Sequence, residues 1–119
     1  FQSDLSSTVA RYRIIQSAKL YRQQIAISAL DYTATRTIAA QAADELLNIS
    51  GIDASFVLYP QGDQVIISAR SIGEANVQVI LEPLGGGGNA ATAGAQIKGK
   101  TVPAVLDDLL KSIDKFFEK

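Results

Sequence analysis

Four consecutive glycines, residues 85–88, give the clearest chemical signal in a sequence that has only nine glycines. Glycine has no Cβ atom, so its backbone reaches positive φ values and a ligand can approach it closely. Converging backbone N–H groups and a fixed cation bind phosphate, and Arg70 supplies a guanidinium that can donate two hydrogen bonds to one phosphate. A glycine run is also typical of a flexible connector, and a lone arginine of a solvated surface charge.

Hydroxyl and amide side chains near Arg70 extend this candidate site. Ser68 and Ser71 offer neutral donors on either side of the arginine. Asn76 suits either a helix N-cap or a ligand contact. Together with the glycines, these residues predict a phosphate-binding set of Ser68, Arg70, Ser71, Asn76, Gly85, Gly86, Gly87 and Gly88.

Catalysis by histidine or cysteine is excluded, because the sequence contains neither residue. This removes the commonest general base, thiol nucleophiles, disulfides and zinc clusters, and leaves a Ser–Lys pairing open. Asp107 and Asp108 are adjacent, and adjacent helix positions point in different directions, so we interpret them as solvated. Asp31 is the best isolated candidate for a functional acid, although turn chemistry explains it as well. We therefore expect no catalytic residues and no metal site in this chain, and no activity of the chain alone.

The composition is that of one globular domain, which we expect to comprise residues 1–119. Apolar residues make up 47% of the chain and charged residues 19%. A net charge of -1 gives no overall field that attracts nucleic acid, so phosphate binding must come from a local site. The longest apolar runs are strand-sized, so we expect no membrane-spanning segment. Because the sequence begins at Phe1 rather than Met, we expect a fragment of a longer protein.

Apolar residues spaced as on one face of a helix, each group preceded by a polar cap, predict four helices. In the first of them, Leu5, Val9, Tyr12 and Ile15 form the apolar stripe. Proline ends the third, because its ring cannot continue a helix interior. The predicted helices cover residues 4–18, a segment from Thr35 or Thr37 to about Asn48, a segment from Ser71 or Asn76 to Pro83, and residues 101–119.

Strands are predicted where apolar and β-branched residues run between turn signals. Residues 24–30 are apolar at nearly every position, which is typical of a central strand buried on both faces. Residues 54–59 and 64–70 flank a turn at Gly62 and predict a hairpin, and residues 93–99 predict a short strand. The expected fold class is α/β (α+β), a small mixed sheet of four to five strands with helices packed on it.

The order of these features resembles a known family. The segment "VIISARSIGEANVQVILEPLGGGGNAATAGAQ" resembles the C-terminal, DHH-associated domain of the DHH phosphoesterases, where a Ser-x-Arg-Ser segment leads through a short helix into Gly-Gly-Gly-His-x-x-Ala-Ala-Gly. Together with "AADELLNISGIDASFVL" before it, the segment "SARSIGEANVQVILEPLGGGG" is similar to the membrane-anchored cyclic-di-AMP phosphodiesterases of that superfamily. The similarity extends over about residues 9–113.

The resemblance implies a division of labour within a longer protein. An upstream DHH domain would hold two manganese ions and open cyclic di-AMP to the linear dinucleotide, while this chain, without a cofactor of its own, binds the substrate. By position, Ser68, Arg70 and Ser71 match the Ser-x-Arg-Ser segment, and the glycines match the glycine loop. Asn89 stands where the family usually has histidine, and Thr92 agrees with the cyclic-dinucleotide branch, so both join the expected contacts.

The resemblance also implies partners and a location. The expected partners are cyclic di-AMP or a short oligonucleotide and the DHH domain of the same protein, and a homodimer is compatible with the sequence. The parent protein would be membrane-anchored, with this domain on the cytoplasmic side and without membrane contact of its own.

Two alternatives stay open at this point. One is a nucleic-acid-binding module of a nanoRNase or single-strand exonuclease, for which a basic groove with stacking aromatic residues is typical. The balanced charge and the four scattered tyrosines count against it. The other is a non-catalytic regulatory or dimerisation domain, in which an exposed Phe116 supplies an interface while Phe117 packs in the core.

Overall fold

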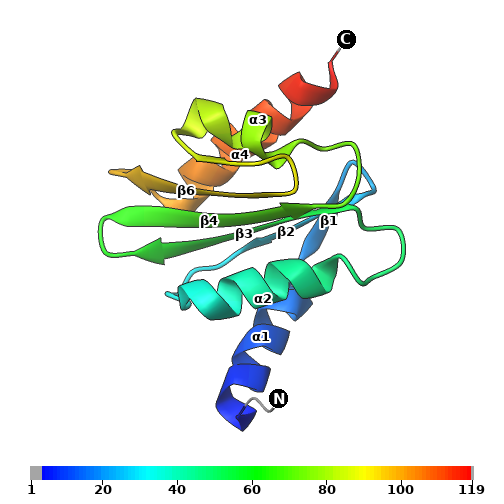
Figure 1. The fold of residues 1–119 in the computed structure, drawn as a ribbon. Coiled ribbons are helices and arrows are strands. Elements are labelled where there is room, and N and C mark those ends of the chain that lie inside the picture. The colour runs from blue at the N-terminus through cyan, green and yellow to red at the C-terminus, as the bar shows by residue number, and fades with distance from the viewer. Residues whose placement is uncertain (1–3, 119) are drawn as a thin grey trace.

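A six-stranded mixed sheet forms the centre of the molecule, with helices on both of its faces (Figure 1). The computed structural model describes residues 4–118. The strand order is β1-β2-β3-β4-β6-β5, and only β2 and β3 run parallel. The predicted α+β class is confirmed, with more strands than the four or five expected. The strands are β1 (Lys19–Tyr21), β2 (Ile25–Ala29), β3 (Ala54–Gln61), β4 (Gln64–Ser71), β5 (Gly87–Gly88) and β6 (Thr92–Lys98).

Each helix begins at a polar residue whose side chain accepts a backbone N–H from the first turn. The second helix is capped by Thr35 rather than Thr37, and the third by Asn76 rather than Ser71, because Ser71 still belongs to a strand. Pro83 lies in a short 3-10 turn that follows the third helix. The helices are α1 (Leu5–Ser17), α2 (Arg36–Leu46), α3 (Val77–Leu81) and α4 (Val102–Phe117), and the 3-10 turn η1 is Glu82–Leu84.

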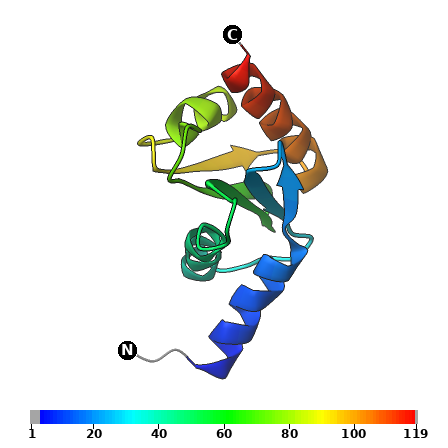
Figure 2. The same ribbon diagram turned by 90° about the vertical axis from the view of Figure 1, so that its right-hand side faces the viewer.

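The two faces of the sheet carry separate apolar cores. Helices α1 and α2 cover one face, and α3 and α4 cover the other (Figures 1 and 2). Burial on both faces explains why the strands are apolar at consecutive positions. β2 is buried as predicted, but it is second from one edge of the sheet, and β3 and β4 occupy the central positions.

Two strands were not predicted. β1 joins β2 through a three-residue turn, residues 22–24, in which Arg22 and Gln23 have positive φ values of 53° and 71°. This backbone conformation is usually signalled by Gly, Asn or Asp, and here that signal is missing. β5 consists of glycines, which have low strand propensity.

Helix α1 forms where it was predicted, but its apolar stripe does not face the core. Leu5, Val9 and Tyr12 are 78%, 49% and 51% exposed, whereas Ile14 is buried. With 3.6 residues per turn, Ile14 lies on roughly the opposite side of the helix from these three residues. Periodicity therefore located the helix, while three residues of its apolar stripe are exposed.

Helix α4 packs through Val105, Leu109 and Ile113, which are fully buried. Phe116 and Phe117 are both partly buried against the same core, and their rings meet edge to face at 5.0 Å between centroids. The expected packing of Phe117 is confirmed. The freely exposed Phe116 of the dimerisation alternative is not found, because the last turn of α4 lies against the core cluster.

The glycine run forms defined structure rather than a flexible connector. Gly85 ends η1 with a φ of 85°, and Gly87 and Gly88 pair with β6 as the edge strand β5. A Cβ atom on Gly86 would lie 2.6 Å from the carbonyl oxygen of Gly94 and 2.9 Å from the Cβ atoms of Leu81 and Ala95. The absence of a side chain therefore lets this backbone lie directly against β6.

We expect Gly86→Ala to lower the free energy of unfolding by about 1–3 kcal/mol, because its methyl group overlaps backbone and core atoms. Gly87→Ala is the matched control, since no atom lies within 4 Å of its added Cβ, and its effect should stay within about 0.5 kcal/mol. Urea denaturation followed by circular dichroism measures both variants. Equal stability of the two variants would contradict the close packing of the glycine run.

Candidate phosphate-binding site

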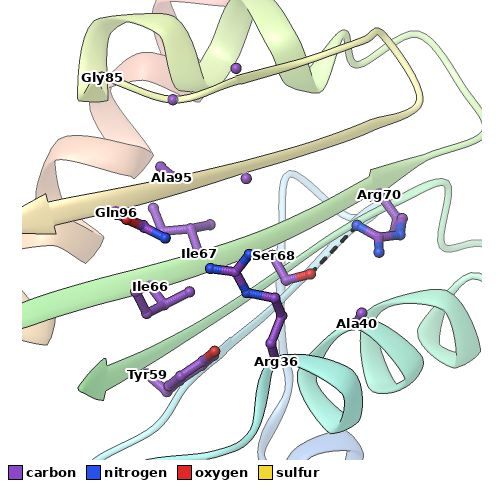
Figure 3. Close-up of a pocket in the computed structure, with 13 residues that line it drawn as sticks. Arg36, Ala40, Tyr59, Ile66, Ile67, Ser68, Arg70, Gly85, Ala95 and Gln96 are labelled. Atoms are coloured by element: carbon purple, nitrogen blue, oxygen red, sulfur yellow. Dashed lines mark hydrogen bonds between the residues drawn. The ribbon is translucent and has the colours of Figure 1, made fainter.

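A cavity of about 530 Å³ opens on the α2 side of the sheet, between α2 and the glycine run (Figure 3). Strands β4 and β6 form its base, the first half of α2 lies on one side, and the start of the glycine run lies on the other. The lining residues shared with the predicted set are Ser68, Arg70, Gly85, Gly86 and Gly87; the others are Arg36, Ala40, Tyr59, Ile66, Ile67, Gly94, Ala95 and Gln96.

Strand register aligns the polar groups at the base of the cavity. Alternate residues of a strand point to the same face of a sheet, so Ser68 and Arg70 project together. Across the β4–β6 ladder, Ser68 is the partner of Gly94 and Arg70 is the partner of Thr92. Because Gly94 has no side chain, the space beside the Ser68 hydroxyl is left open.

The cavity exists because the helices on this face stop short of β6. α2 packs over β3 and the adjoining part of β4, and Ala40 is the helix residue that borders the cavity together with Arg36. A small residue at position 40 leaves room above β4. The open part of the sheet is therefore the part that carries Ser68 and Arg70.

The Arg70 side chain is held in a defined orientation. Its Nε–H donates to Asp44 Oδ1 at 2.9 Å, and Nη1 donates to the Ala69 carbonyl oxygen at 2.9 Å and to Ser68 Oγ at 3.5 Å. The arginine side chain is 17% exposed, whereas that of Asp44 is 64% exposed. The guanidinium is thus fixed by its own surroundings before any ligand binds, which lowers the entropic cost of binding.

The lining of the cavity favours an anion. Arg36 and Arg70 are its charged lining residues, and both are cations. Burial raises the pKa of Tyr59, and the nearby charge of Arg36 opposes that rise. The Tyr59 hydroxyl therefore stays protonated at neutral pH and can donate a hydrogen bond.

Some predicted residues lie elsewhere. Ser71 is 5% exposed and does not line the cavity; its hydroxyl donates to the Asp53 carbonyl oxygen at 3.3 Å and accepts from the Gly73 N–H at 3.2 Å. Asn76 caps α3, with its side-chain oxygen 3.1 Å from the Val79 nitrogen. Both side chains are engaged in local structure.

The end of the glycine segment also lies outside the cavity lining. Asn89 Oδ1 accepts the N–H groups of Ala91 and Thr92, each at 2.9 Å, and so closes the turn between β5 and β6. Gly88 adopts a φ of 147° next to this turn. Thr92 is exposed and lies beside Arg70 across the β4–β6 ladder, so it remains close to the site without bordering the cavity.

Sequence reasoning missed Arg36, Gly94 and Gln96. The last two alternate along the predicted strand 93–99, and alternation alone would have placed them on one face. Arg36 directly follows the Thr35 cap, so its position at the start of α2 was readable from the sequence. The sequence could not predict that Arg36 lies near β4, because this proximity depends on how α2 packs on the sheet.

Within residues 4–118, no group of three or more Asp, Glu, His or Cys side chains is arranged to hold a metal ion. The resemblance assigns the two manganese ions to a DHH domain, and this assignment stays a prediction. Between residues 4 and 118, no helix is both long and apolar enough to cross a membrane.

The sequence matches one domain family over most of its length. Residues 22–119 match the DHHA1 domain. This chain belongs to the DHHA1 domain family. The whole chain is 39% identical over 98% of its length to the cyclic-di-AMP phosphodiesterase PdeA of Listeria monocytogenes, and 40% identical over 96% of its length to the cyclic-di-AMP phosphodiesterase GdpP of Bacillus subtilis. It spans 18% of the length of each relative.

Solved structures share the fold of this DHHA1 domain. An exopolyphosphatase-related protein from Bacteroides fragilis superposes with a TM-score of 0.82 at 18% identity, over 97% of this chain and 36% of that chain. The pGpG-specific phosphodiesterase PggH of Vibrio cholerae gives a TM-score of 0.62 at 20% identity, over 92% and 39% of the two chains. The predicted resemblance to DHH-family proteins is confirmed.

We expect Asn89→Ala to reduce the free energy of unfolding by about 1–2 kcal/mol, because two backbone N–H groups lose their acceptor. Asn89→Asp keeps an oxygen at the same place and should stay close to the wild-type stability. Thermal unfolding of the two variants provides the comparison. If alanine were tolerated as well as aspartate, the amide oxygen would not be what holds this turn.

Proposed function

We propose that this DHHA1 domain binds a phosphate of a nucleotide substrate, cyclic di-AMP, in the cavity between α2 and the glycine run. A DHH domain of the same protein would then hydrolyse the bound cyclic dinucleotide to its linear form. The observation that carries this proposal is the fixed guanidinium of Arg70, which lies beside the Ser68 hydroxyl in a cavity lined by two arginines and by no acid.

The chemistry of the lining suits a phosphodiester. Arginine donates paired hydrogen bonds to phosphate oxygens, and such charge-assisted bonds are roughly twice as strong as neutral ones. Ser68 adds a neutral donor, and Gly85 and Gly87 expose backbone at the edge of the cavity without a side chain in the way. The domain would thereby hold the phosphate in a fixed orientation, and such positioning of a substrate speeds the reaction.

The size and the surroundings of the cavity support a nucleotide rather than phosphate alone. A volume of about 530 Å³ falls within the roughly 300–1,000 Å³ typical of small-molecule sites. Tyr59, Ile66 and Ala40 add apolar surface beside the arginines. The relatives named as cyclic-di-AMP phosphodiesterases make cyclic di-AMP the first ligand to test.

The remaining parts of the proposal concern the longer protein. Two manganese ions in the DHH domain would supply metal-activated hydrolysis, while the present residues bind and orient the substrate. The parent protein would be anchored in a membrane, with this domain on the cytoplasmic side.

We expect Arg70→Gln to weaken the binding of cyclic di-AMP by about tenfold or more, since one charge-assisted hydrogen-bonding group is lost. Lys111→Gln is the control for the loss of one positive charge, because Lys111 is 77% exposed on α4, away from the cavity. Isothermal titration calorimetry with cyclic di-AMP, its linear product and a short RNA measures the affinities.

Equal affinity of wild type and Arg70→Gln would remove Arg70 from the site. A clear preference of the wild type for the RNA would favour the nucleic-acid-binding alternative over cyclic-dinucleotide binding. In the same samples, incubation with manganese should give no turnover by the 119-residue chain, and sustained hydrolysis would contradict the proposed division of labour.

A further inference from the structure

We infer that Arg36 is a second phosphate-binding residue, which holds the same phosphate as Arg70 from the α2 side of the cavity. This inference rests on the proposed function and extends it to a residue that the sequence motif does not include. It assigns the site two guanidinium groups, one from the sheet and one from a helix, with the Ser68 hydroxyl between them.

The position of Arg36 is fixed by the start of α2. Thr35 caps the helix by accepting the Ile38 N–H at 3.1 Å, and Arg36 is the first helical residue after this cap. Figure 3 shows its side chain extending from α2 toward β4, with the guanidinium groups of Arg36 and Arg70 on opposite sides of Ser68. Both arginines line the same cavity.

The two arginines differ in how their charge is compensated. Arg70 already forms an ion pair with Asp44 at 2.9 Å. The guanidinium of Arg36 forms no ion pair, hydrogen bond or ring contact with any residue in the described range 4–118. Among the described residues, no acid lines the cavity. The positive charge of Arg36 is therefore less neutralised than that of Arg70, and it attracts an anion more strongly.

The other arginines in residues 4–118 show that a partner is the usual arrangement in this molecule. Arg11 pairs with Glu45 at 3.4 Å, and Arg22 pairs with Asp114 at 3.0 Å. Arg13 lies 4.6 Å from the centre of the Tyr32 ring. Among the arginines of residues 4–118, Arg36 alone lines a cavity without an acidic or aromatic partner. This arrangement is expected of a guanidinium that binds a ligand anion.

One phosphate bound by both arginines would account for the different number of free N–H donors on each guanidinium. Arg70 Nε is occupied by Asp44 and Nη1 by protein acceptors, so this arginine offers only part of its hydrogen-bonding edge. All five N–H donors of the Arg36 guanidinium are free of hydrogen bonds to the described residues and can bind a ligand. Together they would neutralise one phosphodiester while Ser68 donates to a remaining oxygen.

The test compares Arg36→Gln, Arg36→Lys, Arg70→Gln and the double variant, with Arg13→Gln as the control that removes an arginine charge outside the cavity. Cyclic di-AMP is titrated into each by calorimetry at two salt concentrations. Arg36→Gln should lose about tenfold in affinity and show a shallower dependence on salt, since one phosphate contact is missing. Arg36→Lys should recover part of that loss, because it restores the charge, and Arg13→Gln should match the wild type.

The double variant tests whether the arginines share one phosphate. If they do, its loss of affinity should be smaller than the product of the two single losses, because groups that hold the same ligand atom are coupled. Strictly multiplicative losses would overturn the shared phosphate. An affinity of Arg36→Gln equal to that of Arg13→Gln would overturn the role of Arg36, and the proposed function would stand if Arg70→Gln still lost binding. No binding by the wild type would overturn both proposals.

Discussion

The packing of α2 on the sheet is the constraint on which the cavity depends. Ala39, Ala42 and Ala43 are fully buried, and their small side chains let the helix backbone lie close to β3. The Ser55 hydroxyl donates to the Ala43 carbonyl oxygen at 2.6 Å and ties the helix to that strand. Because α2 is held over β3 and the near side of β4, it cannot also cover β6, and the polar residues of β4 remain open.

The opposite face of the sheet is covered by two helices. There α3 packs on β6, and α4 packs on β2 and β3. The Ser112 hydroxyl donates to the Ile80 carbonyl oxygen and joins the two helices. Ser71, on this face, is buried and engaged in local hydrogen bonds. Three neighbouring β4 residues, Ser68, Arg70 and Ser71, therefore have different access to ligands because of the face on which each lies.

Local signals in the sequence predicted much of this arrangement. The cap at Thr101, the hairpin at Gly62 and the strand at 93–99 all depend on nearby residues and were located correctly. The cap of α2 is Thr35, one of the two threonines predicted. The alternation along β4 explains why Ser68 and Arg70 lie on one face and Ser71 on the other. These features need no knowledge of how distant segments pack.

Features that depend on tertiary contacts were not predictable. β5 exists because Gly87 and Gly88 pair with β6, and glycine itself gives no strand signal. The apolar stripe of α1 is largely exposed, and its spacing did not show that Ile14 would be the buried residue. Arg36 could be placed on a helix but not in a cavity, since only the packing of α2 brings it above β4.

Amide and arginine side-chain chemical shifts of the isotopically labelled chain, recorded by NMR during titration with cyclic di-AMP, test the central claim most directly. The account predicts that the shifts concentrate at Ser68, Arg70, residues 85–87 and the Nε–H groups of Arg36 and Arg70, all around the open part of the sheet. Shifts confined to the α3 and α4 face, or none at saturating ligand, would contradict it.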